Sequence, residues 1–91
     1  MYSKFGQFID GKWQPSHKKE TYDVFNPANE ELIGKSSKAS SVDVEKALKS
    51  AQKGFHVWKK FSPWDRAKII RKIADLMRKK NNELAKWMTL E

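Results

Sequence analysis

Two histidines are the side chains of this 91-residue sequence best suited to act as a general base or a metal ligand. His17 lies in a lysine-flanked segment, and His56 lies beside Phe55 and close to Trp58. Neither has a second ligand or an orienting carboxylate at a spacing that a metal site or a proton-transfer pair requires. We therefore expect both to be surface histidines.

Carboxylate, thiol and phosphate-binding chemistry is not indicated either. Glu30 and Glu31 are adjacent, and adjacent side chains in a strand or turn point apart, so they do not form an acid–base dyad. The sequence has no cysteine, which excludes disulfides, thiolate metal sites and a cysteine nucleophile within this chain. Its four glycines are too scattered to make a phosphate-binding loop. We expect no catalytic and no cofactor-binding residue here.

The positive charge is concentrated in the second half of the chain. The net charge is +8 and the pI is near 9.8, so a nucleic-acid partner must be considered. Residues 42–91 hold thirteen Lys and Arg against six acidic residues. Seven of these bases cluster in one helical segment: Arg66, Lys68, Arg71, Lys72, Arg78, Lys79 and Lys80. Because Trp58, Trp64 and Trp87 fall near the apolar stripes, we expect this cluster to be a solvated helix face. A small basic nucleic-acid-binding or protein-interaction module is the alternative function.

Nothing in the sequence indicates a membrane protein. No apolar run approaches the length of a membrane span. The first seven residues lack the apolar stretch of a signal peptide. We therefore expect a cytoplasmic protein with no membrane partner.

Residues 1–39 have the pattern of extended structure. An Asp10-Gly11 pair favours a two-residue hairpin turn, which predicts strands over Gln7–Ile9 and Lys12–Gln14. The β-branched and aromatic run Thr21–Phe25 predicts another strand. An Asn-Pro turn follows it, and residues 31–38 are predicted to return antiparallel as a second hairpin.

Residues 40–91 change to a helical period. Ser40 and Asp43 form a capping-box pattern before a helix that is expected to end near residues 58–60. Ser62 is the predicted N-cap of a second helix, with Pro63 at its first position. Asn81 is the predicted cap of a third, shorter helix.

These elements define the expected fold class. It is α+β, with two short β-hairpins over residues 1–39 followed by two to three amphipathic helices over residues 40–91. We expect residues 1–91 to form a single, partial domain.

An ordered set of segments resembles the N-terminus of aldehyde dehydrogenases. The segments are Phe8–Trp13, Asn26-Pro27-Ala28, the stripe Val44, Ala47, Ala51, Phe55 and Trp58, then Trp64–Ile70 and Leu84–Glu91. The last of them is similar to the family segment that directly precedes a Gly-Lys-Pro turn. Its Met-Thr-Leu-Glu ending is most similar to succinate-semialdehyde dehydrogenases.

The resemblance implies a parent enzyme with a dinucleotide-binding domain, a catalytic domain and an oligomerisation hairpin. Such enzymes oxidise aldehydes with NAD or NADP: a cysteine forms a thiohemiacetal, a hydride leaves to the nicotinamide, and a glutamate activates water. Those residues lie downstream in the family. We therefore expect an N-terminal fragment of the dinucleotide-binding domain, with no activity and no cofactor of its own, from a parent that oxidises succinic semialdehyde. A cloning boundary, a disrupted gene or a split gene would each leave such a piece.

The resemblance also implies one minor site and a partner. Some members hold a monovalent cation with backbone carbonyls before the Asn-Pro turn and with a carboxylate, which implies Val24, Phe25 and Glu91 here, together with a ligand from outside the chain. The helix stripes would cover the sheet of the parent enzyme. We expect the apolar helix faces to bind either the remainder of the enzyme or a second copy of the chain.

Overall fold

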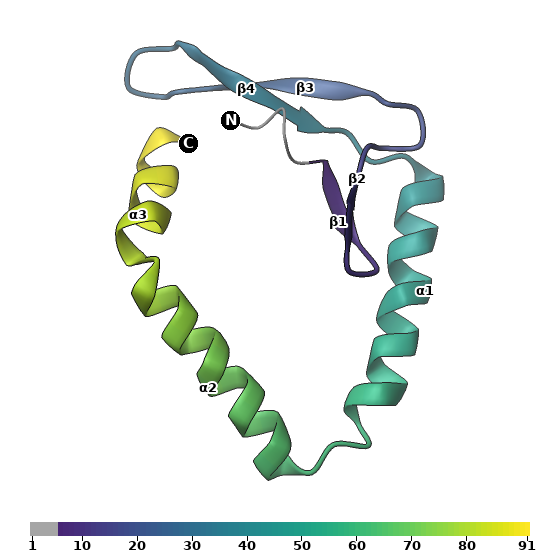
Figure 1. Ribbon diagram of the computed structural model, residues 1–91. Helices are drawn as coiled ribbons and strands as arrows, with labels where there is room; N and C mark the ends of the chain where they lie inside the picture. The colour runs from purple at the N-terminus through teal and green to yellow at the C-terminus, as the bar shows by residue number, and fades with distance from the viewer. Residues whose placement is uncertain (1–5) are drawn as a thin grey trace.

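Residues 6–91, which the computed structural model describes, form two separate two-stranded antiparallel sheets followed by three helices (Figure 1). The strands are β1 (Gln7–Ile9), β2 (Lys12–Gln14), β3 (Thr21–Phe25) and β4 (Leu32–Ser37). The helices are α1 (Ser41–Trp58), α2 (Pro63–Lys79) and α3 (Asn81–Leu90). The predicted α+β fold of two hairpins and then helices is confirmed. No helix in the described part of the chain is long and apolar enough to cross a membrane.

The first hairpin, β1–β2, has the predicted turn. Asp10 and Gly11 both have positive φ, at 55° and 75°, as a type I′ turn requires. The register pairs Phe8 with Trp13, and their rings lie 5.0 Å apart, centroid to centroid. The hairpin lies against α1, so its turn faces a helix that is far away in the sequence.

The second hairpin, β3–β4, turns through the Asn-Pro segment as predicted. The Asn26 side chain accepts a hydrogen bond from the Ala28 backbone N–H at 3.0 Å, and that of Asn29 accepts one from Glu31 at 3.1 Å. The register shifts between Val24 and Phe25, which is a β-bulge near the end of β3.

The helices begin where their capping residues are. At the start of α1, the backbone N–H and the hydroxyl of Ser40 both donate to Asp43 Oδ2, at 2.8 and 2.9 Å. At the start of α2, Ser62 Oγ accepts from the Asp65 N–H at 3.1 Å. The prediction for α3 is wrong by one residue. Lys80 is the N-cap, because it ends α2 with φ −100° and ψ 14° and α3 begins at once, so Asn81 is already helical.

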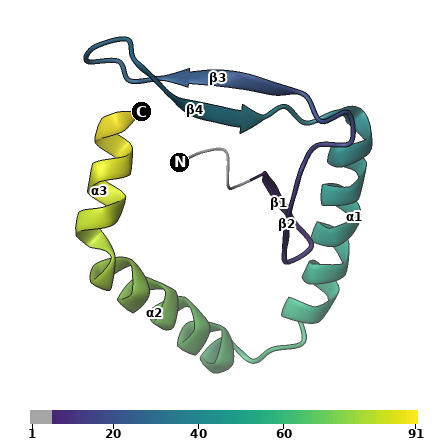
Figure 2. The same ribbon diagram turned by 45° about the horizontal axis from the view of Figure 1, so that its top comes forward.

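The elements form an open arc and bury no common core. The two views show α1 and α2 diverging from the turn at residues 59–62, while α3 returns toward the β3–β4 hairpin (Figures 1 and 2). The radius of gyration is 16.5 Å, whereas a compact chain of this length has about 12 Å. None of the hydrophobic residues described is buried. The apolar stripes of the helices are therefore exposed in the chain by itself.

Candidate functional site

The two histidines that the sequence put forward have no catalytic surroundings. The His56 ring lies on the exposed face of α1, 5.6 Å from the Phe55 ring in an edge-on arrangement. His17 is exposed, and it acts through its backbone N–H rather than through its ring. Within residues 6–91 there is no cluster of three or more His, Cys, Asp or Glu side chains that could hold a metal ion.

The His17 backbone N–H donates to Asp43, the most connected carboxylate of the described residues. The two Asp43 oxygens lie 3.0 and 3.1 Å from this nitrogen, and Ser40 occupies one of them as well. Asp43 is only 2% exposed. The backbone N–H of Ser40 is the main cause that holds the pKa of Asp43 well below its usual range, helped by His17 and opposed by burial. A carboxylate bonded in this way holds the 15–20 loop on the start of α1, which is a structural role.

The residues proposed for a cation site belong to the end of β3 and to the position after α3. In both views the marked C-terminus lies next to the β3–β4 hairpin (Figures 1 and 2). Val24 is half-buried, and Phe25 and Glu91 are exposed. The bulge between Val24 and Phe25 interrupts the ladder locally.

The basic cluster on α2 and at its C-cap is partly neutralised by nearby acidic residues of α2 and α3. Arg78 pairs with Asp75 at 2.9 Å, and Lys80 pairs with Glu83 at 3.8 Å. Both pairs are exposed and lie three residues apart, an ordinary spacing for a solvated helix face. This agrees with the interpretation of the cluster as a solvated face rather than as a nucleic-acid surface.

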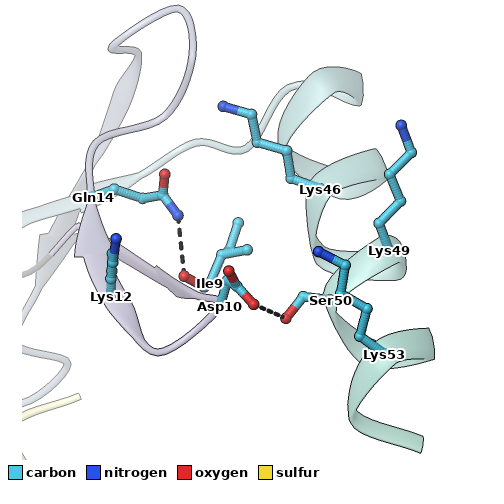
Figure 3. A pocket seen from close by; sticks show the side chains of 8 residues that line it. All are labelled: Ile9, Asp10, Lys12, Gln14, Lys46, Lys49, Ser50 and Lys53. Carbon is cyan, nitrogen blue, oxygen red and sulfur yellow. Dashed lines mark hydrogen bonds between the residues drawn. The ribbon is translucent and has the colours of Figure 1, made fainter. Parts of the chain in front are cut away.

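A cleft between the first hairpin and α1 is the polar site that sequence reasoning missed. It has a volume of about 290 Å³, and its lining residues are Ile9, Asp10, Lys12, Gln14, Lys46, Lys49, Ser50 and Lys53 (Figure 3). Three of its four lysines follow the spacing i, i+3, i+7 on α1, which places them on one face. That spacing was visible in the sequence, but only the fold brings Lys12 of β2 opposite to them.

A second hollow, of about 280 Å³, lies at the junction of α2 and α3. It is mainly apolar, and its lining residues are Met77, Arg78, Asn81, Leu84, Ala85 and Met88. Met88 is 80% exposed, and Trp64 at the start of α2 is 83% exposed. Contiguous exposed apolar surface is typical of protein-interaction sites.

The arrangement of hairpins and helices is that of a known family. The aldehyde dehydrogenase family model matches residues 13–91. The chain belongs to the aldehyde dehydrogenase family. The predicted resemblance is thereby confirmed.

Solved structures of aldehyde dehydrogenases superimpose closely on this chain. A point mutant of betaine aldehyde dehydrogenase from Staphylococcus aureus, in complex with NAD⁺, is 36% identical over 93% of this chain, with a TM-score of 0.88. Succinate-semialdehyde dehydrogenase from Burkholderia pseudomallei is 29% identical over 94% of this chain, with a TM-score of 0.90. A putative aldehyde dehydrogenase from Burkholderia cenocepacia is 28% identical over 94%, also with a TM-score of 0.90.

The match covers only part of these relatives. This chain spans 18% of the length of each of the three. Its two hairpins and three helices therefore correspond to a fragment of the aldehyde dehydrogenase fold.

Proposed function

We propose that this segment forms the N-terminal part of the dinucleotide-binding domain of an NAD(P)-dependent aldehyde dehydrogenase. In that setting it is a scaffold, and it does not itself carry out the chemistry. The observation that carries the proposal is the combination of a close superposition on aldehyde dehydrogenases with the absence of any buried hydrophobic side chain among the described residues. A segment that has the family's backbone but no core of its own is built to pack against further protein.

The accessible surface area of the chain also supports packing against further protein. The accessible surface of the chain is 7908 Å², whereas a compact protein of this mass exposes about 5,500 Å². The excess is comparable to the area that a stable protein–protein interface removes from water. Packing against the rest of a catalytic subunit would remove such an area.

For the parent reaction we propose oxidation of succinic semialdehyde to the acid, with NAD or NADP as hydride acceptor. NAD is supported by the NAD⁺ complex of the Staphylococcus relative, and the substrate by the match to the Burkholderia pseudomallei enzyme. The test uses the whole enzyme encoded by the reading frame that contains this segment. It compares kcat/KM for succinic semialdehyde and betaine aldehyde with each cofactor. A higher value for betaine aldehyde would overturn the substrate and leave the family intact.

The scaffold role is tested by a graft. The Staphylococcus betaine aldehyde dehydrogenase is made with residues 1–91 of this chain in place of its matched segment, and this protein is called the grafted enzyme below. We expect it to reduce NAD⁺ with betaine aldehyde, while the 91-residue chain alone with NAD⁺ or NADP⁺ and either aldehyde does not. Turnover by the isolated chain, or a grafted enzyme that is inactive, would contradict the proposal.

The cation site is part of the same proposal. Backbone carbonyls of Val24 and Phe25 and the carboxylate of Glu91 would hold a monovalent cation, completed by a ligand from outside this chain. The bulge at Val24 and the position of the C-terminus next to the β3–β4 hairpin support it. Potassium should raise the unfolding temperature of the grafted enzyme relative to tetramethylammonium. Glu91→Gln should abolish this difference and Glu45→Gln should not; an unchanged response to Glu91→Gln would contradict the site.

We also propose a cytoplasmic location and, for the chain without the rest of a subunit, self-association through the apolar faces of α2 and α3. Cell fractionation tests the location.

A further inference from the structure

The cleft between β1–β2 and α1 has walls that are fixed to each other. Ser50 Oγ on α1 donates to Asp10 Oδ1 in the hairpin turn at 2.9 Å, across 40 residues of sequence. On the hairpin side, Gln14 Nε2 donates to the Ile9 carbonyl at 3.3 Å and so is held within its own hairpin. Figure 3 shows the Ser50–Asp10 bond between the helix and the hairpin turn, and the Gln14–Ile9 bond within the hairpin. The cleft therefore has a defined width.

The cations of this cleft have no carboxylate partners. Over residues 6–91, the ion pairs involve Lys35, Arg78 and Lys80, all of which lie outside the cleft. The single acidic residue of the lining is Asp10, and it accepts the Ser50 hydroxyl. Four lysines against one aspartate leave a net positive charge in a space of about 290 Å³.

The positions of the lysines make an anion favourable. Lys46 and Lys53 are seven residues apart, about two turns along the same face of α1. Figure 3 shows Lys46 and Lys53 extending toward the hairpin, whereas Lys49 extends away from it. An anion seated between α1 and Lys12 would gain charge-assisted hydrogen bonds from the lysines that reach it.

We propose that this cleft is a binding site for a small polyanion of the diphosphate class. Its volume lies at the lower end of the range for ligand pockets, which suits a compact anion. The lining contains no aromatic side chain on which a base could stack, which argues against single-stranded nucleic acid as the ligand. The site does not depend on aldehyde oxidation.

The test is a titration of the 91-residue chain with pyrophosphate at constant ionic strength, followed by amide chemical shifts. We expect saturable shifts in the β1–β2 turn and the middle of α1, and weaker binding of inorganic phosphate. The double substitution Lys46→Gln and Lys53→Gln should weaken binding about tenfold, because each removes one close charge. Lys49→Gln is the matched control on the same helix, since its ammonium extends away from the hairpin, and it should have a smaller effect.

A second substitution, at Asp10, should strengthen pyrophosphate binding instead of weakening it. Asp10→Asn keeps an acceptor for Ser50 and a residue that tolerates positive φ, but it removes the negative charge beside the anion. It should tighten pyrophosphate binding several-fold, while Asp23→Asn on β3 should not. Circular dichroism checks that each variant keeps the fold.

Three results would overturn the proposal. The first is a pyrophosphate titration that matches sodium chloride at the same ionic strength. The second is equal weakening by the double substitution and by the pair Lys68→Gln and Lys72→Gln on α2, which would mean general charge attraction. The third is equal affinity for phosphate and pyrophosphate, which would contradict the diphosphate assignment. None of these results bears on the activity of the grafted enzyme, so this inference and the proposed function fail separately.

Discussion

The backbone N–H of His17 donates to both carboxylate oxygens of Asp43, at 3.0 and 3.1 Å, although 26 residues separate the two. The same carboxylate accepts from Ser40 at the start of α1. One buried side chain thus connects the loop after the first hairpin to the first helix. The connection holds the segment after the first hairpin on the first turn of α1.

Asp43→Asn should release that loop. An amide side chain presents one acceptor where the carboxylate presents two, so the bonds from His17 and Ser40 cannot all be kept. We expect faster amide exchange at residues 15–20 and at the first turn of α1 in the grafted enzyme, measured by mass spectrometry. Glu45→Gln, a similar change on the exposed side of the same turn, is the control. Unchanged exchange in Asp43→Asn would show that the carboxylate is not needed there.

The lowered pKa of Asp43 predicts that the fold loses stability in acid. This pKa is lower in the folded chain than in the unfolded chain, mainly through the Ser40 N–H, so the unfolded chain binds the extra proton. The stabilisation from Asp43 is therefore fully present above about pH 4, the unfolded value, and is lost as the pH falls through the folded value. Unfolding of the grafted enzyme followed from about pH 5 down to about pH 2, a range that spans the unfolded value of a carboxylate, should show a smaller acid loss in Asp43→Asn. Parallel curves for both proteins would contradict this.

Turns and helix caps that depend only on neighbouring residues could be predicted from the sequence. The Asp10-Gly11 turn and the Ser62 cap depend on residues within a few positions, and their types alone indicated them. The third helix start was misplaced because Lys80 both ends α2 and caps α3, which leaves Asn81 inside the helix. Asp43 was expected as a local capping residue, and its bond to His17 depends on a loop whose path the sequence did not reveal.

The lysine cleft was missed for the same reason. The sequence emphasised the basic residues of α2, where charges are dense, but two of those carry local acidic partners. The unpaired lysines of α1 became a site only because Ser50 meets Asp10, a contact between segments 40 residues apart. Charge density along a chain does not report which charges lack partners.

The apolar hollow between α2 and α3 predicts that the isolated chain associates with itself. The hollow between α2 and α3 leaves Met88 80% exposed, and without the rest of a subunit a second copy is what can cover it. Burying a methionine is worth about 1.5–3 kcal/mol. Met88→Gln should therefore raise the dissociation constant of the isolated chain about tenfold or more in sedimentation velocity. Lys68→Gln on the polar side of α2 is the control. A wild-type chain that stays monomeric at high concentration would rule the association out.

Two glycines give opposite predictions for the same substitution. Gly54 lies inside α1, and an added Cβ there meets nothing within 4 Å. Gly54→Ala should therefore stabilise the helix by about 0.8–1 kcal/mol, the difference in helix propensity, and increase the helical circular dichroism of the chain. Gly6 lies before β1, and an added Cβ would overlap the carbonyl group of Gln14.

Gly6→Ala should accordingly displace β1 from β2, because the overlap is with backbone atoms that no rotamer change can move. Amide exchange of residues 7–14 should accelerate in Gly6→Ala, and the Phe8–Trp13 contact should weaken in near-ultraviolet circular dichroism. Since the β1–β2 turn forms one wall of the lysine cleft, Gly6→Ala should also weaken pyrophosphate binding, whereas Gly54→Ala should leave it unchanged. If both substitutions had the same effect on the hairpin, the close approach of Gly6 to Gln14 would not be what holds the two strands in register.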